Sequence, residues 1–285
     1  MTILREKMID LMTVRNFSLN TQKSYLYSVS CYAKYYDRSP DQLNQEDLQR
    51  YLVYLVKDKH LSANSCRIQL QAIRFLYLNV LKREACHVAI LAPKRKLRIP
   101  ELLTREEALR IVNAPKNINH KMQLQICYAC RLRRSEVLAL RVKDVDGQRE
   151  LLKIEQGKGA KDRFVPLSKG LLELLREYWR EFKPTDKLFY TNRFDRSPAA
   201  ATLSKLYTRT KRQVGVNKKG GIHALRHAFA THQLEAGLPL HLLQRWLGHA
   251  DIRTTMRYIH WVPSYHNGQS RFINLLSEGN DYELS

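Results

Sequence analysis

The residues His223-Ala224-Leu225-Arg226-His227 are the most informative stretch of this 285-residue chain. They begin a predicted helix over residues 223–236, for which Gly237 is a suitable C-terminal cap. Arg226 follows His223 by three positions and His227 follows it by four, so the three side chains lie on one helix face. Two imidazoles and a guanidinium can therefore converge on one point.

Four more elements accompany this helix, two before it and two after it. The first is Leu-Arg-Arg-Ser-Glu-Val-Leu-Ala-Leu-Arg over residues 132–141, which places Arg133 just before a predicted helix. The second is Gly-Lys-Gly-Ala-Lys-Asp-Arg over residues 157–163, which is typical of a charged turn. Leu247-Gly248-His249 and then Tyr258, nine residues beyond that histidine, complete the set. Each element alone has an ordinary explanation, but their order and spacing together are highly specific.

The charge of the chain indicates a polyanionic partner. There are 49 Lys+Arg against 27 Asp+Glu, a formal charge of +22 with His neutral. Residues 1–100 carry 17 and 8 of these (17 − 8 = +9), and residues 101–285 carry 32 and 19 (32 − 19 = +13), so both parts are basic. Nucleic acid is the most general polyanion, because Lys and Arg that neutralise phosphates release condensed counterions. A basic surface that serves solubility is the alternative.

The first ninety residues are predicted to form a small helical bundle, because apolar residues recur there at helical spacing. The stripes are Tyr25/Val29/Tyr32/Tyr36, Leu48/Tyr51/Leu52/Leu55 and Ile68/Ala72/Phe75/Leu76. Residue types that cap helix starts precede them: Ser18 and Asn20, Asn44, and Ser62. We expect the tyrosines to pack in the core and at its rim rather than to stack on bases.

The second part of the chain is predicted to be mixed. The basic, proline-bounded segment 93–100 is predicted to be a linker, which either follows a phosphate backbone or is simply solvated. A capping box at Thr104-Arg-Glu-Glu107 restarts the helices. Strand-like runs at 151–155 and 163–167 flank the charged turn and predict a hairpin. Further helices are expected at 171–182, 200–214 and 240–247, the last capped by Gly248.

In these motifs the sequence resembles the tyrosine recombinase (phage integrase) family, above all its compact bacterial Xer-like and integron-type members. The resemblance covers nearly the whole chain. It implies a mainly α-helical fold with a small antiparallel β-sheet, divided into a SAM-like helical core-binding domain at 1–92, the basic linker at 93–100, and an α+β catalytic domain with a C-terminal tail at 101–285. It also implies a site-specific DNA recombinase that forms a covalent 3′-phosphotyrosine intermediate and acts as a tetramer on paired sites in double-stranded DNA.

The resemblance assigns six catalytic residues. Arg133 and Arg226 are the implied phosphate clamp, Lys158 the implied general acid, and Tyr258 the implied nucleophile, assisted by His223 and His249. Residue chemistry agrees, because two planar, bidentate guanidiniums suit the oxygens of a phosphodiester under attack. A tyrosine hydroxyl, with a pKa of about 10, needs a nearby proton acceptor and a positive field to attack at neutral pH.

Several neighbours compete for these roles. Lys161 lies on the same hairpin tip as Lys158, and Tyr265 follows Tyr258 by seven residues, outside the family spacing. For His227 we expect packing or support rather than direct chemistry. Arg131 stands where the family usually has a small residue, often Gly. It could add phosphate contacts, or it could crowd the turn and weaken catalysis.

Other classes of protein fit the sequence less well. No apolar run approaches the roughly 18 to 20 residues of a membrane span, so we expect a soluble, cytoplasmic protein without membrane contact. Five cysteines, with a single C-x-x-C at Cys127 and Cys130, predict reduced thiols and no metal site. Because one phosphodiester replaces another, no ATP or other cofactor is expected. Two alternatives remain open: an architectural or regulatory DNA-binding protein of the same fold that does not cleave, and a relaxing enzyme like the type IB topoisomerases.

The C-terminal segment leads to a first prediction. Residues 269–276 carry a short apolar face at Phe272, Leu275 and Leu276. In the family such a segment docks on the neighbouring protomer, whereas the alternative is packing on its own domain. Deletion of residues 265–285 is expected to weaken the pairing of two DNA sites while sparing the binding of one. Native gel electrophoresis measures both, and unchanged assembly on paired sites would contradict the prediction.

Overall fold

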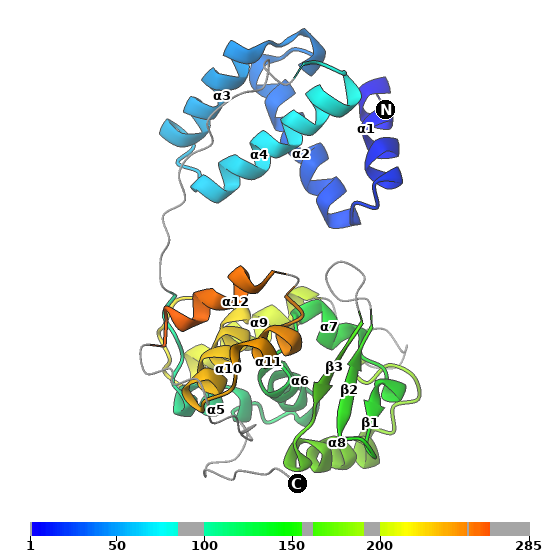
Figure 1. Ribbon diagram of the computed structural model, residues 1–285, viewed down its shortest axis with the longest axis vertical. Coiled ribbons are helices and arrows are strands. Elements are labelled where there is room, and N and C mark those ends of the chain that lie inside the picture. Colours follow the sequence, from blue (N-terminus) through cyan, green and yellow to red (C-terminus); the bar gives the residue numbers. More distant parts are fainter. Residues whose placement is uncertain (1, 85–99, 156–161, 191–199, 250, 263–285) are drawn as a thin grey trace. The chain divides into compact units, whose positions relative to one another are not determined.

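The computed structural model describes residues 2–84, 100–155, 162–190, 200–249 and 251–262. The chain divides into two compact units, Met1–Arg98 and Ile99–Ser285 (Figure 1). Each unit has its own hydrophobic core. The predicted linker at 93–100 lies almost wholly outside the described residues. Within the described residues no helix is long and apolar enough to cross a membrane.

The first unit is a helical bundle, as predicted. Its elements are α1 (Ile3–Val14), α2 (Leu19–Tyr36), the 3-10 turn η1 (Pro40–Gln42), α3 (Gln45–Lys57), α4 (Ala63–Phe75) and the π-helical turn η2 (Leu76–Val80). Ser18, Asn44 and Ser62 cap the starts of α2, α3 and α4 with their side chains, whereas Asn20 lies inside α2. The caps satisfy amide groups that have no partner within the helix.

Tyrosines fill much of this first core. Tyr32, Tyr51 and Tyr77 are buried, and the hydroxyls of Tyr32 and Tyr77 lie 3.1 Å apart and share a hydrogen bond. The packing role expected for the tyrosines is therefore confirmed for these three. The predicted stripe of α4 is wrong at Ile68, which is 43% exposed, because Cys66, Leu70 and Ile73 form the buried face of that helix instead.

The second unit is mainly helical with a small antiparallel sheet, which confirms the predicted fold class. Its elements are α5 (Arg105–Asn113), α6 (Ile118–Ala129), α7 (Arg134–Ala139), the 3-10 turn η4 (Val142–Asp144), β1 (Val145–Asp146), β2 (Leu151–Ile154), β3 (Arg163–Pro166), α8 (Lys169–Phe182), α9 (Ala200–Gln213), α10 (His223–Glu235), α11 (Leu240–Leu247) and α12 (Ile252–Ile259). The sheet order is β1-β2-β3, and Ile154 pairs with Arg163 at the end of the predicted hairpin where the chain passes from β2 to β3.

The central helix of this unit is α10, which carries the motif His223-Ala224-Leu225-Arg226-His227. It packs against α5, α6, α11 and α12 (Figure 1). Residues 228–234 are all buried, although Thr231, His232 and Gln233 are polar. His232 is satisfied by the Tyr128 hydroxyl at 2.8 Å and by the Leu103 carbonyl at 2.9 Å. A helix buried on this scale fixes the positions of the residues at its first turn.

The turn between α6 and α7 holds Arg131 in an unusual state. Its backbone lies in the left-handed region, at φ 48°, a conformation that favours glycine. Its side chain is completely buried, and none of its three guanidinium nitrogens has a hydrogen-bond partner among the described residues. The guanidinium stacks over the ring of Phe229, 5.9 Å from the ring centroid. Burial, then the charges of Arg163 and Arg226, lower its pKa well below the ordinary value.

A buried arginine without hydrogen bonds should destabilise the fold, whereas a paired one should support it. Replacing Arg131 by Met keeps an unbranched apolar side chain but removes the charged guanidinium. We expect Arg131→Met to raise the free energy of unfolding by about 1 to 4 kcal/mol. Arg163→Met is the matched control: it removes an arginine whose side chain is 9% exposed and makes two hydrogen bonds to Glu136, and should cost about 3 to 5 kcal/mol.

Denaturant unfolding, followed by tryptophan fluorescence, measures the change in the free energy of unfolding of the second unit for both variants. All three tryptophans, Trp179, Trp246 and Trp261, belong to the second unit. Equal destabilisation by the two variants would contradict the expected contrast.

Candidate active site

Five of the six residues predicted to act together lie in the described part of the chain, on or next to four helices of the second unit. Arg133 is the N-cap of α7, His223 and Arg226 lie in the first turn of α10, His249 follows the end of α11, and Tyr258 lies on α12. Because α10 packs against both α11 and α12, His249 and Tyr258 lie near the start of α10, where His223 and Arg226 stand.

Arg226 is held rigidly. It is 2% exposed, and it donates from Nη1 to the Arg131 carbonyl at 2.8 Å and from Nη2 to the Leu247 carbonyl at 2.5 Å. Burial and the charge of Arg133 lower its pKa to about 10, so it is still a cation at neutral pH. The two carbonyls come from the turn before α7 and the end of α11. Arg226 therefore joins those elements and is oriented by them.

Arg133 is fixed by a buried carboxylate. Its Nη1 donates to Oε1 of Glu136 at 2.7 Å, and its backbone amide donates to Oε2 at 2.7 Å. Glu136 also accepts two hydrogen bonds from Arg163, at 2.9 and 2.8 Å. Burial raises the pKa of Glu136, but the hydrogen bonds and charges of Arg163 and Arg133 outweigh this effect and hold it at about 2. The carboxylate therefore stays ionised and orients both arginines.

Gly248 is required by this arrangement. It ends α11 in the left-handed region, at φ 59°, and a Cβ built there would lie 2.9 Å from Cδ of Arg163. The side chain of Arg163 thus passes directly over the glycine on its way to Glu136. The sequence predicted Gly248 as a helix cap, and the close approach is a second reason for glycine at this position.

Tyr258 lies in the centre of the cluster. It is 4% exposed, and its hydroxyl lies 3.0 Å from Nδ1 of His227. The rings of Tyr258 and His249 are parallel within 5°, with centroids 6.5 Å apart. Burial raises the pKa of the hydroxyl, and the charges of Arg226, Arg131 and Arg133 act in the opposite direction. The phenol is therefore protonated in the resting protein and surrounded by positive charge.

The histidines of the cluster are neutral at physiological pH. Burial and nearby arginines, Arg226 first, lower the pKa of His249 to about 3. Burial, His223 and Arg226 lower the pKa of His227 to about 4. Partial burial and the charges of Arg226 and Arg133 also lower the pKa of His223. A neutral imidazole has one unprotonated nitrogen, which can act as a hydrogen-bond acceptor.

The structure brings together most of the residues singled out by sequence. Arg133, Arg226, His249 and Tyr258 form one cluster, and His223 reaches it through the ring of His227, 4.9 Å away. His227 was expected to pack or support, and its Nδ1 lies 3.0 Å from the Tyr258 hydroxyl. Lys158 and its competitor Lys161 lie outside the described residues, as does Tyr265.

Three supporting residues were given no role at the sequence level: Glu136, Arg163 and Thr255. Glu136 and Arg163 stand within the quoted motifs, so their presence was visible, but their pairing links positions 27 residues apart. The hydroxyl oxygen of Thr255 lies 2.9 Å from Nδ1 of His249. On α12 it stands one turn before Tyr258, and that spacing is the signal that could have identified it.

Models of known protein families match both halves of the chain. The model described as Phage integrase family matches residues 101–264. The model described as Phage integrase, N-terminal SAM-like domain matches residues 4–86. The two matches fall on the second and the first unit, respectively.

Relatives and solved structures agree with these matches. The putative integrase/recombinase y4qK of Sinorhizobium fredii is 40% identical over 91% of this chain and 84% of the relative. The tyrosine recombinase XerA of Pyrococcus horikoshii is 33% identical over 85% of this chain and 83% of its own length. A XerH site-specific recombinase bound to palindromic difH substrate has the same fold, with a TM-score of 0.72 at 24% identity over 87% of this chain and 78% of that structure. With its two halves matched in order and a 40% identical relative along nearly all of its length, this chain belongs to the phage integrase family of tyrosine recombinases.

Proposed function

We propose that this protein is a site-specific DNA recombinase that cuts and rejoins DNA strands through a covalent 3′-phosphotyrosine intermediate. Arg133, Lys158, His223, Arg226, His249 and Tyr258 are the proposed catalytic residues. The observation that carries the proposal is the position of the Tyr258 hydroxyl: it is buried beside a neutral imidazole and within the field of Arg133 and Arg226. A protein that only binds DNA needs no such environment for a tyrosine.

Arg133 and Arg226 form the proposed phosphate clamp. Each is held by other parts of the site, Arg133 by Glu136 and Arg226 by two backbone carbonyls. Donors that are fixed before the substrate arrives stabilise a developing charge without the cost of reorganisation. The nonbridging oxygens of the scissile phosphate gain charge in the transition state, and the remaining guanidinium donors can bind them.

The reaction exchanges one phosphodiester for another. The phenol oxygen of Tyr258 bonds to phosphorus as the bond from phosphorus to the 5′ oxygen breaks. Lys158 is the proposed general acid that protonates the leaving 5′ oxygen. A second DNA 5′-hydroxyl then attacks the phosphotyrosine and releases Tyr258. Bond energy is conserved throughout, so the chemistry balances without ATP.

Double-stranded DNA is the proposed partner, bound by a tetramer on paired sites. Relatives support this part of the proposal: among the solved structures are a lambda integrase dimer bound to a core site and a lambda integrase tetramer bound to a Holliday junction. We also propose the domain limits predicted from sequence, with core binding by residues 1–92, a linker at 93–100 and catalysis by 101–285. A cytoplasmic location belongs to the same proposal, because a recombinase must reach its DNA substrate.

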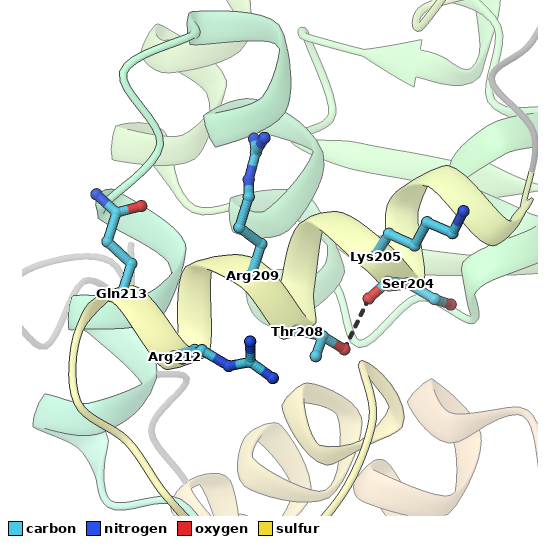
Figure 2. Close-up of a pocket in the computed structure, with 6 residues that line it drawn as sticks. All are labelled: Ser204, Lys205, Thr208, Arg209, Arg212 and Gln213. Carbon is cyan, nitrogen blue, oxygen red and sulfur yellow. Dashed lines mark hydrogen bonds between the residues drawn. The ribbon is translucent and has the colours of Figure 1, made fainter.

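An exposed basic face of α9 is a proposed contact for the DNA backbone. Lys205, Arg209 and Arg212 recur at helical spacing on the side of that helix away from its buried residues. With Ser204, Thr208 and Gln213 they line an open hollow of about 640 Å³, and Figure 2 shows these six side chains along the helix. Arg134, next to the proposed clamp residue Arg133, donates to the Ser204 hydroxyl at 2.9 Å. This bond ties the basic face to the start of α7.

Tyr258→Phe tests the nucleophile. The variant should lose all covalent attachment to DNA while its affinity is unchanged, because the phenol oxygen forms the bond to phosphorus. The measurement is denaturing capture from a library of nicked, randomised duplexes, followed by sequencing of the attached DNA. Tyr207→Phe is the matched control, since it removes a buried hydroxyl without a hydrogen-bond partner among the described residues. Any adduct with Tyr258→Phe would falsify the assignment.

Alanine substitution tests the basic face of α9. Replacing Lys205, Arg209 and Arg212 together should weaken binding to all sequences. The slope of log affinity against log salt should become shallower by about 0.9 for each phosphate that the variant no longer neutralises. The control removes the same charge from exposed positions of α8, at Lys169, Arg176 and Arg180. Fluorescence anisotropy over a salt series measures both, and equal slopes for the two triple variants would place the DNA elsewhere.

A further inference from the structure

The hydroxyl of Tyr258 has one imidazole within hydrogen-bonding distance among the described residues, and it is that of His227. The distance from Oη to Nδ1 is 3.0 Å. His223 makes no hydrogen bond to this hydroxyl in the described part of the chain, although its ring touches that of His227. The histidine nearest to the nucleophile is therefore the one that is not among the six residues of the motif assignment.

His249 is not available for the same contact. Its Nε2 lies 3.4 Å from Nη2 of Arg226, and arginine can only donate, so Nε2 is the acceptor. Its Nδ1 then carries the proton and donates to the Thr255 hydroxyl at 2.9 Å. Both nitrogens are engaged, and the ring lies parallel to that of Tyr258 instead of facing its hydroxyl.

His227 is placed and charged as a proton acceptor. Its ring is half-buried and held edge-on between His223 and Trp261, with centroid distances of 4.9 and 5.5 Å. The groups that face it are Tyr258 on α12, and His223 and Arg226 on its own helix. Its lowered pKa, about 4, leaves the imidazole neutral at physiological pH. With its single proton on Nε2, the neutral imidazole accepts the phenol's hydrogen bond at Nδ1.

We propose that His227 is a further catalytic residue, whose Nδ1 takes the proton of the Tyr258 hydroxyl as the phenol oxygen attacks the scissile phosphorus. This inference rests on the proposed function. The phosphorus–phenol bond forms and the bond to the 5′ oxygen breaks, while the phenol proton moves to His227 and the leaving oxygen receives a proton from the general acid. In the reverse attack His227 returns its proton to the departing phenol oxygen.

The direction of the two pKa shifts sets the timing of this transfer. Burial raises the pKa of Tyr258 and lowers that of His227, so the proton stays on the tyrosine in the resting protein. Once the phenol oxygen donates electrons to phosphorus, its proton becomes strongly acidic. Transfer to His227 is then favourable, and it accompanies bond formation instead of preceding it.

Two amide variants separate proton transfer from simple positioning. Asn places its side-chain oxygen close to where Nδ1 of histidine lies, so His227→Asn keeps an acceptor for the Tyr258 hydroxyl but has no basic nitrogen. His227→Gln places its oxygen near the position of Nε2 and serves as a second variant without a base. His241→Asn, on an exposed position of α11, is the matched control.

The assay measures single-turnover DNA cleavage by the full-length protein. The substrate is a nicked duplex that carries the site recovered by covalent capture. We expect His227→Asn and His227→Gln to cleave about 10²- to 10⁴-fold more slowly than the wild type, with unchanged DNA affinity. His241→Asn should cleave at the wild-type rate. Wild-type cleavage by His227→Asn would overturn the proposal, because the variant would then show that an acceptor suffices.

The pH dependence and the leaving group give independent readouts. Without a base, Tyr258 must lose its proton to solvent, so the cleavage rate of His227→Asn should rise about tenfold per pH unit between about pH 6 and 9. The wild-type rate should change less, because neutral His227 is present throughout that range. Parallel pH profiles would count against the proposal.

A 5′-bridging sulfur in the substrate leaves as a thiolate and needs no proton. This substrate should restore cleavage by Lys158→Ala, which lacks the proposed general acid, and should not restore cleavage by His227→Asn. Rescue of His227→Asn would show that His227 acts on the leaving group, and the proposal would fall. If the wild type forms no adduct with any DNA, the proposed function fails as well. If the wild type does and His227→Asn matches it, this inference alone fails.

Discussion

The carboxylate of Glu136, shared between Arg133 and Arg163, is the interaction on which the site depends. Arg133 belongs to the start of α7, and Arg163 is the first residue of β3, so one buried anion fixes a helix and the sheet relative to each other. The stem of Arg163 reaches that anion only because Gly248 has no side chain. Gly248 in turn directs the chain into His249. Three of the sequence motifs thus meet at a single ion cluster.

This cluster also has a role in the proposed mechanism. The proposed phosphate clamp must hold its donors still, and a long arginine side chain in water does not do so. Glu136 removes that freedom from Arg133, while the carbonyls of Arg131 and Leu247 remove it from Arg226. The rigidity is established when the second unit folds. Its cost has therefore already been met when a phosphodiester arrives.

Local signals in the sequence predicted most of the helices correctly. Asn44, Ser62 and Thr104 cap helix starts by contacts within three residues, and such contacts can be inferred from a short window. The hairpin of β2 and β3 followed from two short β-rich runs around a charged turn. β1 was not predicted, because two residues carry no periodicity. Ile68 was wrongly placed in the core, since spacing alone does not decide which of two apolar stripes faces inward.

The site was predictable as a list of residues and much less so as a geometry. His223 and His227 share a helix face, and the packing of α12 against α10 decides which of them contacts Tyr258. The pairing of Glu136 with Arg163 and the burial of Arg131 depend on contacts across the fold, so no short window contains them.

The clustered arginines have a thermodynamic consequence for the whole second unit. Positive charges repel one another within a group of four arginines: Arg131, Arg133, Arg163 and Arg226. Among the described residues, Glu136 is the carboxylate that they share. The folded protein therefore contains electrostatic repulsion that a bound phosphate would relieve. Any ligand that binds the folded state more tightly than the unfolded state raises its stability by mass action. The melting temperature of this unit thus becomes a function of the concentration of its anionic substrate, and folding and substrate binding are coupled equilibria.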